Sequence, residues 1–276
     1  IDAGDGNDSV VAGDGDDQLL GGLGDDTLEA GDGSDFVDAG DGSDLILAGA
    51  GDDTVIAAAG NDTLLGGAGN DSLSGGIGND YFVADAGDDT IDGGVGTDTL
   101  DFSAVTSNAN INLATGVASS ADTGTDRIAL VNGNSTIEDV TAGSGDDSVV
   151  GSALANRLIG GAGADTILAG DGNDWVLFDA NDARIDGGGG VDVLAITTPY
   201  DAQNLNPVNF STLGVQLSGF EEIDLKGNAK QFISLSAQDV FDLSDTSDIL
   251  KIHGEAGDKV SLAGNWVASG TQPVIY

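Results

Sequence analysis

The chain has 276 residues and is strongly acidic, with 48 Asp and Glu residues against 7 Lys and Arg residues and a formal net charge of −41. The absence of Cys and the single His exclude disulfides, thiolate metal sites and His-rich zinc sites. No apolar run approaches the ~20 residues of a membrane-spanning helix, and a field of this sign repels nucleic acid and anionic lipid. We therefore expect cations as partners, and neither nucleic-acid binding nor membrane insertion.

A nonapeptide repeat fills residues 3–101 without a gap, in eleven consecutive copies from AGDGNDSVV to GGVGTDTLD. Position four is Gly and position eight is apolar in all eleven copies. Position two is Gly in nine copies, and Ala58 and Asp85 are the exceptions. Position six is Asp in every copy, namely Asp8, Asp17, Asp26, Asp35, Asp44, Asp53, Asp62, Asp71, Asp80, Asp89 and Asp98.

Each position of the repeat has a physical interpretation. Gly at fixed places supplies positive φ and lets backbone carbonyls approach a ligand, and Asp supplies a hard oxygen ligand. The last three residues form a very short strand whose middle side chain points inward. Six turn residues and three strand residues make half a coil, so that two repeats make one coil of a flattened solenoid with coils stacked ~4.8 Å apart. Repeats n and n+2 then share an edge, and their Asp side chains meet.

This pattern resembles the G-G-x-G-x-D-x-U-x nonapeptide of the RTX (repeats-in-toxin, haemolysin-type calcium-binding) family. The resemblance implies an all-β fold, a right-handed parallel β-roll that is a β-solenoid with two nonapeptides per coil. It also implies Ca²⁺ held between neighbouring turns by the position-six carboxylates and by backbone carbonyls of the Gly-rich turns. The pattern leaves open which carbonyls take part.

A second, partly degenerate array of six nonapeptides covers residues 142–195. Position eight stays apolar in all six, but the fifth copy has Ala183 at position six and departs from the pattern. The predicted metal ligands of this array are Asp147, Asn156, Asp165, Asp174 and Asp192.

The two arrays divide the chain into four segments. Residues 1–101 hold the first array, and residues 102–141 are predicted to be inserted longer coils without calcium turns. Residues 142–195 hold the second array, and residues 196–276 are predicted to be a β-rich cap over the last coil.

The predicted cap has a different character from the arrays, because it contains all three prolines and all four lysines. Short strands are expected at 222–225, 232–235, 249–252 and 259–262, with a capped helical turn that begins at Ser236. This region resembles the C-terminal part of large type-I-secreted RTX adhesins.

Residues 1–126 contain 26 Asp, one Glu and no Lys or Arg, so that self-repulsion opposes their folding. The stacked position-six residues predict about nine Ca²⁺ ions in 3–101 and about two to four in 142–195. Because the core has one large apolar residue per nine, metal binding is expected to supply much of the folding free energy.

These patterns predict a calcium-binding module that folds on extracellular Ca²⁺, and the resemblance to the RTX family implies that it does so after type I secretion. It would serve secretion, folding and rigidity of a bacterial surface adhesin, with the type I secretion machinery as a partner and an extracellular or cell-surface location. The alternatives are the calcium-binding secretion module of an exoenzyme, such as a protease, lipase or epimerase, and a surface-layer structural protein. No enzyme activity is expected, because the adjacent Asp pairs recur too regularly for one active site.

One further feature is an apolar stripe, which we define as Leu45, Leu47, Leu65, Tyr81 and Val83. These residues occupy outward strand positions of alternate repeats. The stripe is explained either by packing against another part of the chain or simple tolerance, or by contact with a neighbouring domain or a second molecule.

Overall fold

The computed structural model describes residues 1–196, 208–210, 215–225, 232–236, 243, 250–254 and 258–263. The chain forms two compact units, residues 1–148 and residues 149–276. Nearly all regular structure in the described part of both units is β-strand.

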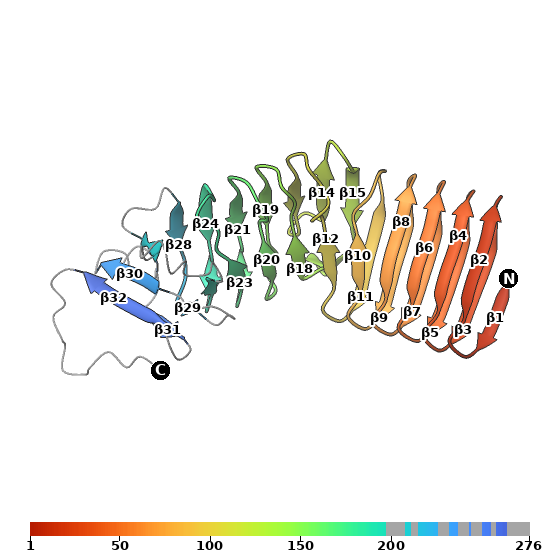
Figure 1. The fold of residues 1–276 in the computed structure, drawn as a ribbon, viewed down its shortest axis with the longest axis horizontal. Coiled ribbons are helices and arrows are strands. Elements are labelled where there is room, and N and C mark those ends of the chain that lie inside the picture. Colours follow the sequence, from red (N-terminus) through yellow and green to blue (C-terminus); the bar gives the residue numbers. More distant parts are fainter. Residues whose placement is uncertain are drawn as a thin grey trace. The chain divides into compact units, whose positions relative to one another are not determined.

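Unit 1 is built from two rows of strands that run along the chain in alternation (Figure 1). The A row has the order β1 (Asp2–Asp5), β3 (Gln18–Leu23), β5 (Phe36–Asp41), β7 (Thr54–Ala59), β9 (Ser72–Ile77), β11 (Thr90–Val95), β15 (Gly124–Ile128), β14 (Val117–Ser120) and β13 (Asn110–Asn112). The B row has the order β2 (Ser9–Asp14), β4 (Thr27–Asp32), β6 (Leu45–Ala50), β8 (Thr63–Ala68), β10 (Tyr81–Val83), β12 (Thr99–Asp101) and β18 (Asp139–Thr141).

Pairing within the nonapeptide array is parallel and offset by eighteen residues, as in Leu19↔Val37 of the A row and Leu28↔Ile46 of the B row. Repeats n and n+2 are therefore neighbours, which confirms the predicted coil of two nonapeptides. The predicted parallel β-roll is confirmed with it.

The strands of the first array are longer than the sequence predicts. Most contain six residues, for example β3, because positions one to three of the next repeat continue the strand instead of joining the turn. Only positions four to six remain as the turn. The prediction of a three-residue strand and a six-residue turn was wrong here, because Gly at position two keeps its place in the ladder at positive φ, as in Gly4↔Gly22.

Two positions of each repeat form the apolar core. Position eight is buried from Leu19 to Leu100 and is half-buried at Val10 in the first coil. The residue two places later, at position one, faces the same way and is Ala or Gly; Ala30, Ala39 and Ala48 are fully buried. The core is thus thin, with one large and one small residue from each repeat.

The insertion at 102–141 adds longer coils, but it does not keep the strands parallel throughout. Strand β15 pairs in parallel with β11, and β18 pairs in parallel with β12. Between them, β13, β14 and β15 form an antiparallel meander, and the short strands β16 (Leu130–Val131) and β17 (Asn134–Ser135) form a second antiparallel pair. Ile111, Leu113, Ile128 and Val140 are buried, so the apolar interior continues through the insertion.

Unit 2 has two rows of its own, built mostly from three-residue strands. Its A row has the order β19 (Ser148–Val150), β21 (Thr166–Leu168), β24 (Arg184–Asp186) and β28 (Gln216–Ser218). Its B row has the order β20 (Arg157–Ile159), β23 (Trp175–Leu177), β26 (Val193–Ala195), β29 (Glu222–Asp224) and β31 (Lys251–His253). Smaller sheets pair β22 (Asp171–Gly172) with β25 (Gly189–Gly190), and join β27 (Val208–Asn209), β30 (Phe232–Ser236) and β32 (Lys259–Ala263).

Strands β28, β29 and β31 extend the two rows of unit 2 past residue 196, where the sequence analysis begins the cap. The four strands predicted in this region correspond to β29, β30, β31 and β32. Of the helical turn predicted after Ser236, Leu243 is described and is helical, and residues 237–242 lie outside the described residues. In the described part of the chain no helix is long and apolar enough to cross a membrane.

The apolar stripe lies on the outer face of the B row of unit 1. Leu47, Leu65 and Val83 are neighbours in one column, and Leu45 and Tyr81 flank Thr63 in the adjacent column. Leu45 is 37% exposed and Tyr81 is 38% exposed, while the other three residues are half-buried. The stripe is therefore continuous in the column of Leu47, Leu65 and Val83, whereas Thr63 separates Leu45 from Tyr81.

Candidate metal centre

The position-six Asp residues form a hydrogen-bonded ladder along each edge of the first array. The backbone N–H of each donates to Oδ1 of the Asp eighteen residues later, for example from Asp26 to Asp44 at 2.7 Å and from Asp62 to Asp80 at 2.9 Å. The contact joins all nine n, n+2 pairs between Asp8 and Asp98. One carboxylate oxygen of each Asp from Asp26 onward is thereby held by the preceding coil.

The second oxygen of most of these carboxylates is buried and has no hydrogen-bond partner in the described part of the chain. This holds for Oδ2 of Asp8, Asp26, Asp35, Asp44, Asp53, Asp62, Asp71, Asp80 and Asp98, and for Oδ2 of Asp174 in the second array. A buried, unpaired carboxylate oxygen is costly unless a cation or a proton compensates it. The recurrence of such buried, unpaired carboxylate oxygens along the array indicates that the turns are built to hold cations.

Backbone carbonyls approach the same oxygens. A Cβ built on Gly75 would lie 2.2 Å from Asp80 Oδ2 and 2.8 Å from the carbonyl oxygen of Gly93. At Gly21 the corresponding atoms are Asp26 Oδ2 at 2.6 Å and the Ala39 carbonyl oxygen at 2.4 Å. The carbonyl of position one in repeat n+2 therefore lies beside the free oxygen of repeat n.

Gly at position two is required by both conformation and space. Gly22 has φ +112°, and a Cβ there would lie 2.1 Å from the carbonyl oxygen of Gly4 in the coil below. Ala58, one of the two exceptions, is held at φ +82°, in the left-handed region that favours Gly. Tight stacking of the turns thus tolerates Ala only with backbone strain.

Burial raises the pKa values of several position-six carboxyls. Burial raises the pKa of Asp62, Asp71 and Asp98 to about 6, and the carboxylates of neighbouring coils add to the effect. Backbone N–H donation opposes this rise but does not cancel it. In the absence of cations, these carboxyls in the folded roll therefore bind a proton more tightly than an ordinary Asp does.

The donor set fits a hard divalent cation. It consists of carboxylate and carbonyl oxygens, which are the ligands that Ca²⁺ takes, six to eight at a time, in flexible geometry. Mg²⁺ demands near-ideal octahedral geometry and keeps its waters, which suits stacked protein turns less well. The orphaned Oδ2 atoms and the adjacent carbonyls therefore fit Ca²⁺.

A second ladder on the outside of the turns was not predicted. The side-chain oxygen at position five accepts the backbone N–H of position five in the next coil, as from Ser34 to Asp16 at 2.9 Å and from Asn79 to Asn61 at 2.8 Å. In this ladder the N–H donor belongs to the later repeat, whereas in the position-six ladder the donor belongs to the earlier repeat. The signal in the sequence is the Asn, Asp or Ser that precedes the Asp in ten of the eleven repeats.

The insertion supplies two carboxylates that the sequence analysis missed. Asp126 Oδ1 accepts the N–H of Asp89 at 3.3 Å, and Glu138 Oε2 accepts the N–H of Asp98 at 3.0 Å. Asp126 is buried, which raises its pKa to about 8, with the charge of Asp89 contributing. Each of these two residues stands two places before a buried apolar residue. Residues 124–128 read G-x-D-x-apolar, and a search for this five-residue motif would have found Asp126.

Unit 2 repeats the ladder with substitutions. The N–H of Asn156 donates to Asp174 Oδ1, and that of Asp174 donates to Asp192 Oδ1, both at 2.8 Å. Asp192 in turn donates to Glu221 Oε2 at 3.1 Å. Glu221 belongs to G-x-E-x-apolar at 219–223 and was also missed. In the degenerate fifth copy Asp182 is buried one residue before Ala183, and burial raises its pKa to about 7.

The predicted ligands differ in how free their oxygens are. Asp8 and Asp17 are half-buried in the first coil, whereas the other predicted ligands are at most 3% exposed. Asp147 uses both oxygens, accepting the N–H of Ala109 at 2.7 Å and that of Gly143 at 3.1 Å. Asn156 Oδ1 accepts the N–H of Ser152 at 2.7 Å. These two are less available to a cation than Asp26 or Asp174, and the ligand set stays a prediction.

Comparison with known proteins agrees with the geometry. No curated protein sequence matches the chain. A family model, the RTX calcium-binding nonapeptide repeat, matches in four copies at residues 1–28, 29–64, 65–100 and 141–176. These matches fall on the two arrays in which the position-six ladder occurs. The chain therefore contains an RTX β-roll region made of calcium-binding nonapeptide repeats.

Proposed function

We propose that this calcium-binding RTX module folds on extracellular Ca²⁺ after type I secretion and gives rigidity to a bacterial surface adhesin. The proposal supposes a chain that stays unfolded where Ca²⁺ is scarce and that meets millimolar Ca²⁺ outside the cell. Extracellular modules bind Ca²⁺ at ~10⁻⁴–10⁻³ M, which suits that change of surroundings.

The observation that carries the proposal is the series of buried carboxylate oxygens that have no hydrogen-bond partner among the described residues. Residues 1–126 hold 26 Asp and no Lys or Arg, so this segment provides no basic side chains to neutralise them. When bound, Ca²⁺ would supply positive charge between stacked carboxylates. The Asp side chains do the positioning, since Oδ1 is held by a backbone N–H and Oδ2 is left to bind the ion.

The test is a Ca²⁺ titration of the whole chain from a chelated start, followed by far-UV circular dichroism, with Mg²⁺ as the control. We expect a cooperative gain of β structure with Ca²⁺ and little with Mg²⁺. Trp175 in β23 reports unit 2 by fluorescence, because its ring lies 4.6 Å from the guanidinium of Arg157. Full β structure in chelator, unchanged by Ca²⁺, would contradict the proposal.

A matched pair of variants separates ligation from general charge. Asp44→Asn removes a buried ladder carboxylate, and Asp41→Asn removes an exposed one from the end of β5. Both relieve the same net charge. We expect Asp44→Asn to shift the Ca²⁺ midpoint upward by about tenfold and Asp41→Asn to leave it nearly unchanged.

We also propose that the chain acts by binding and not by catalysis, and that secretion involves the type I machinery and an extracellular location. The regular recurrence of the ladder supports a structural role, since no single carboxylate pair of the array is set apart as a reaction centre. A secretion assay in which the export rate ignored external Ca²⁺ would count against the folding role.

The apolar stripe on the B row of unit 1 is proposed to contact a neighbouring domain of the same protein. The continuous column of Leu47, Leu65 and Val83 supports this. The double variant Leu47→Asp with Leu65→Asp would test it, because unchanged solubility and oligomeric state would remove the reason for the contact.

A further inference from the structure

Residue 85 breaks the repeat at position two, where nine of the eleven copies have Gly. It occupies position two of the tenth nonapeptide, and it is Asp. The strand here is shortened, because β10 ends at Val83, and the next pairing is an isolated bridge between Ala68 and Ala86. The Asp85 carboxylate accepts the backbone N–H of Gly67 at 2.6 Å. The backbone here departs from the regular strand of the other repeats, and this departure leaves room for the Asp85 side chain in the turn.

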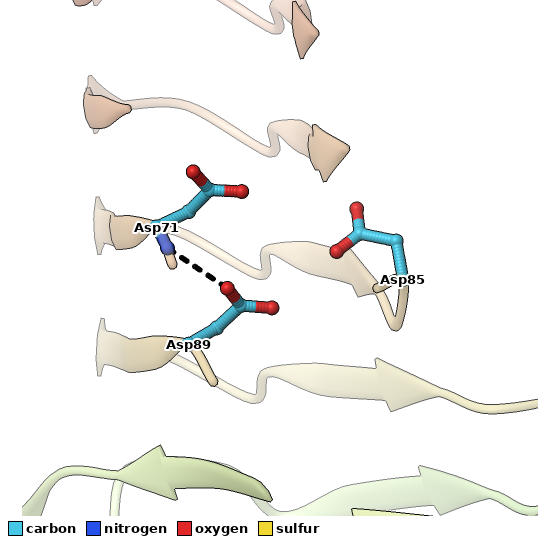
Figure 2. A group of neighbouring side chains, drawn as sticks. All are labelled: Asp71, Asp85 and Asp89. Carbon is cyan, nitrogen blue, oxygen red and sulfur yellow. Dashed lines mark hydrogen bonds between the residues drawn. The ribbon is translucent and has the colours of Figure 1, made fainter. Parts of the chain in front are cut away.

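That side chain points at the position-six ladder. Figure 2 shows the Asp71 and Asp89 carboxylates extending toward Asp85, which approaches from the other side of the turn. One carboxylate oxygen from each of the three lies within 4.8 Å of the others. In the described part of the chain this is the one such group of three acidic, His or Cys side chains.

An independent observation shows that the group faces a ligand position. Asp71 is 2% exposed, and its Oδ2 has no hydrogen-bond partner among the described residues. The Oδ1 atoms of Asp71 and Asp89 are already held by the N–H groups of Asp53 and Asp71, both at 2.8 Å. The orientation of these two carboxylates is thus fixed before any ion binds.

The neighbouring gaps, which are the spaces between the stacked turns of repeats n and n+2, have no room for a third carboxylate at position two. At Gly67 a Cβ would lie 1.8 Å from the carbonyl oxygen of Gly49, and at Gly94 it would lie 2.2 Å from that of Gly76. Both residues also have positive φ, near +100°. The gap between repeats eight and ten is therefore different in kind from its neighbours.

We propose that Asp71, Asp85 and Asp89 form a three-carboxylate cation site, which binds Ca²⁺ at least about tenfold more tightly than the two-carboxylate gaps and prefers trivalent lanthanides still more. Two oxygens on one Ca²⁺ can be up to about 5.2 Å apart, so one ion can reach all three. The inference rests on the proposed calcium-binding function and assigns to Asp85 a ligand role outside the nonapeptide pattern.

The position of the site gives it a consequence for folding. Asp89 donates its N–H to Asp126 of the insertion, and β11 of the same coil pairs with β15. The site therefore lies where the regular array meets the first inserted coil. Filling it first fixes the end of the array against which the remaining repeats stack.

The experiment uses the whole chain and Tb³⁺ as the probe. The Ca²⁺-loaded protein receives one equivalent of Tb³⁺, is desalted in Ca²⁺ buffer, and the retained Tb³⁺ is counted by metal analysis. Asp85→Asn keeps an oxygen for the Gly67 N–H, and Asp85→Gly restores the residue of the repeat, so at least one variant should fold. Asp41→Asn is the charge-matched control.

We expect the unsubstituted chain and Asp41→Asn to retain about one Tb³⁺ each, and both Asp85 variants to retain at least about tenfold less. Far-UV circular dichroism of the same samples reports Ca²⁺-dependent folding. Equal retention by the unsubstituted chain and a folded Asp85 variant would overturn the three-carboxylate site alone. An unsubstituted chain whose β structure ignores Ca²⁺ would instead contradict the proposed function.

Discussion

The first array, residues 3–101, and the second array, residues 142–195, share a core but differ in how they manage charge. In both, position eight is apolar and buried, as at Leu64 and Leu158. The first array has Asp at position six in every repeat and no basic residue, whereas the second has Asn156, Ala183, Arg157 and Arg184. The buried apolar residues at position eight can thus be kept while the acidic residues at position six are replaced.

The difference extends to local contacts. Arg184 pairs with Asp186 at 2.5 Å, and the Arg157 guanidinium lies over the Trp175 ring. Farther along unit 2, Lys251 pairs with Glu222 at 2.8 Å. Exposed pairs of this kind contribute little each, but they place positive charge beside an acidic roll. The comparison teaches that unit 2 carries part of its counter-charge in the chain, while the first array has no basic side chain of its own to supply it.

The largest expected effect is a difference in hydrogen exchange when Ca²⁺ is chelated. We expect amides of β3 to β9 to lose nearly all protection, because their stacked carboxylates then repel without compensation. Amides of β23 and β26 should keep more of theirs. Exchange measured by mass spectrometry with and without chelator checks this, and equal loss in both arrays would break the comparison.

Core truncation should affect both arrays alike when Ca²⁺ is present. Leu64→Ala and Leu158→Ala each remove a fully buried side chain, so each should lower the free energy of unfolding by about 2–5 kcal/mol. The outward neighbours in the same strands, Leu65→Ala and Ile159→Ala, serve as controls and should cost under about 1 kcal/mol. Denaturant unfolding in Ca²⁺ measures all four. A large asymmetry between Leu64→Ala and Leu158→Ala would mean that the two cores are not equivalent.

Acid should partly replace Ca²⁺, most strongly in unit 1. Burial raises the pKa of Asp71 to about 6, of Asp85 to about 7 and of Asp126 to about 8, from the ordinary Asp value of 3.8. The folded state then binds more protons than the unfolded state, so this stability is fully present below pH 3.8 and is lost as pH rises through about 6 to 8. Circular dichroism in chelator should show β structure increasing as pH falls through that range. A β signal that is flat across it would contradict the raised pKa values.

The smallest expected effect concerns Ala58. Replacing it by Gly relieves a positive φ and should raise stability by about 0.5–1 kcal/mol. The neighbouring Ala57→Gly is the opposite control, because Ala57 is fully buried and loses a packed methyl group. The thermal midpoint in Ca²⁺ should therefore rise for the first variant and fall for the second. A fall for both would mean that the φ of Ala58 is not strained.

Much of the candidate site was predictable because a repeat maps sequence position directly onto spatial position. One Asp every nine residues, on a coil of eighteen, has to stack on its counterpart two repeats later, as Asp26 does on Asp44. Asp126, Glu138 and Glu221 escaped the same reasoning because the segments before them are not multiples of nine. Asp126 and Glu138 reach the ladder only after antiparallel strands of the insertion return the chain to the edge.

The sequence alone determined the period, the buried apolar file and the acidic edges, because these follow from side chains that recur on one repeated backbone. Only the tertiary structure decided which oxygens are held and which are free, since that depends on whether a backbone N–H of the preceding coil reaches Oδ1. It also decided the six-residue strands and the entry of Asp85 into the ladder. Both depend on how closely one coil packs on the next, a distance that no single repeat specifies.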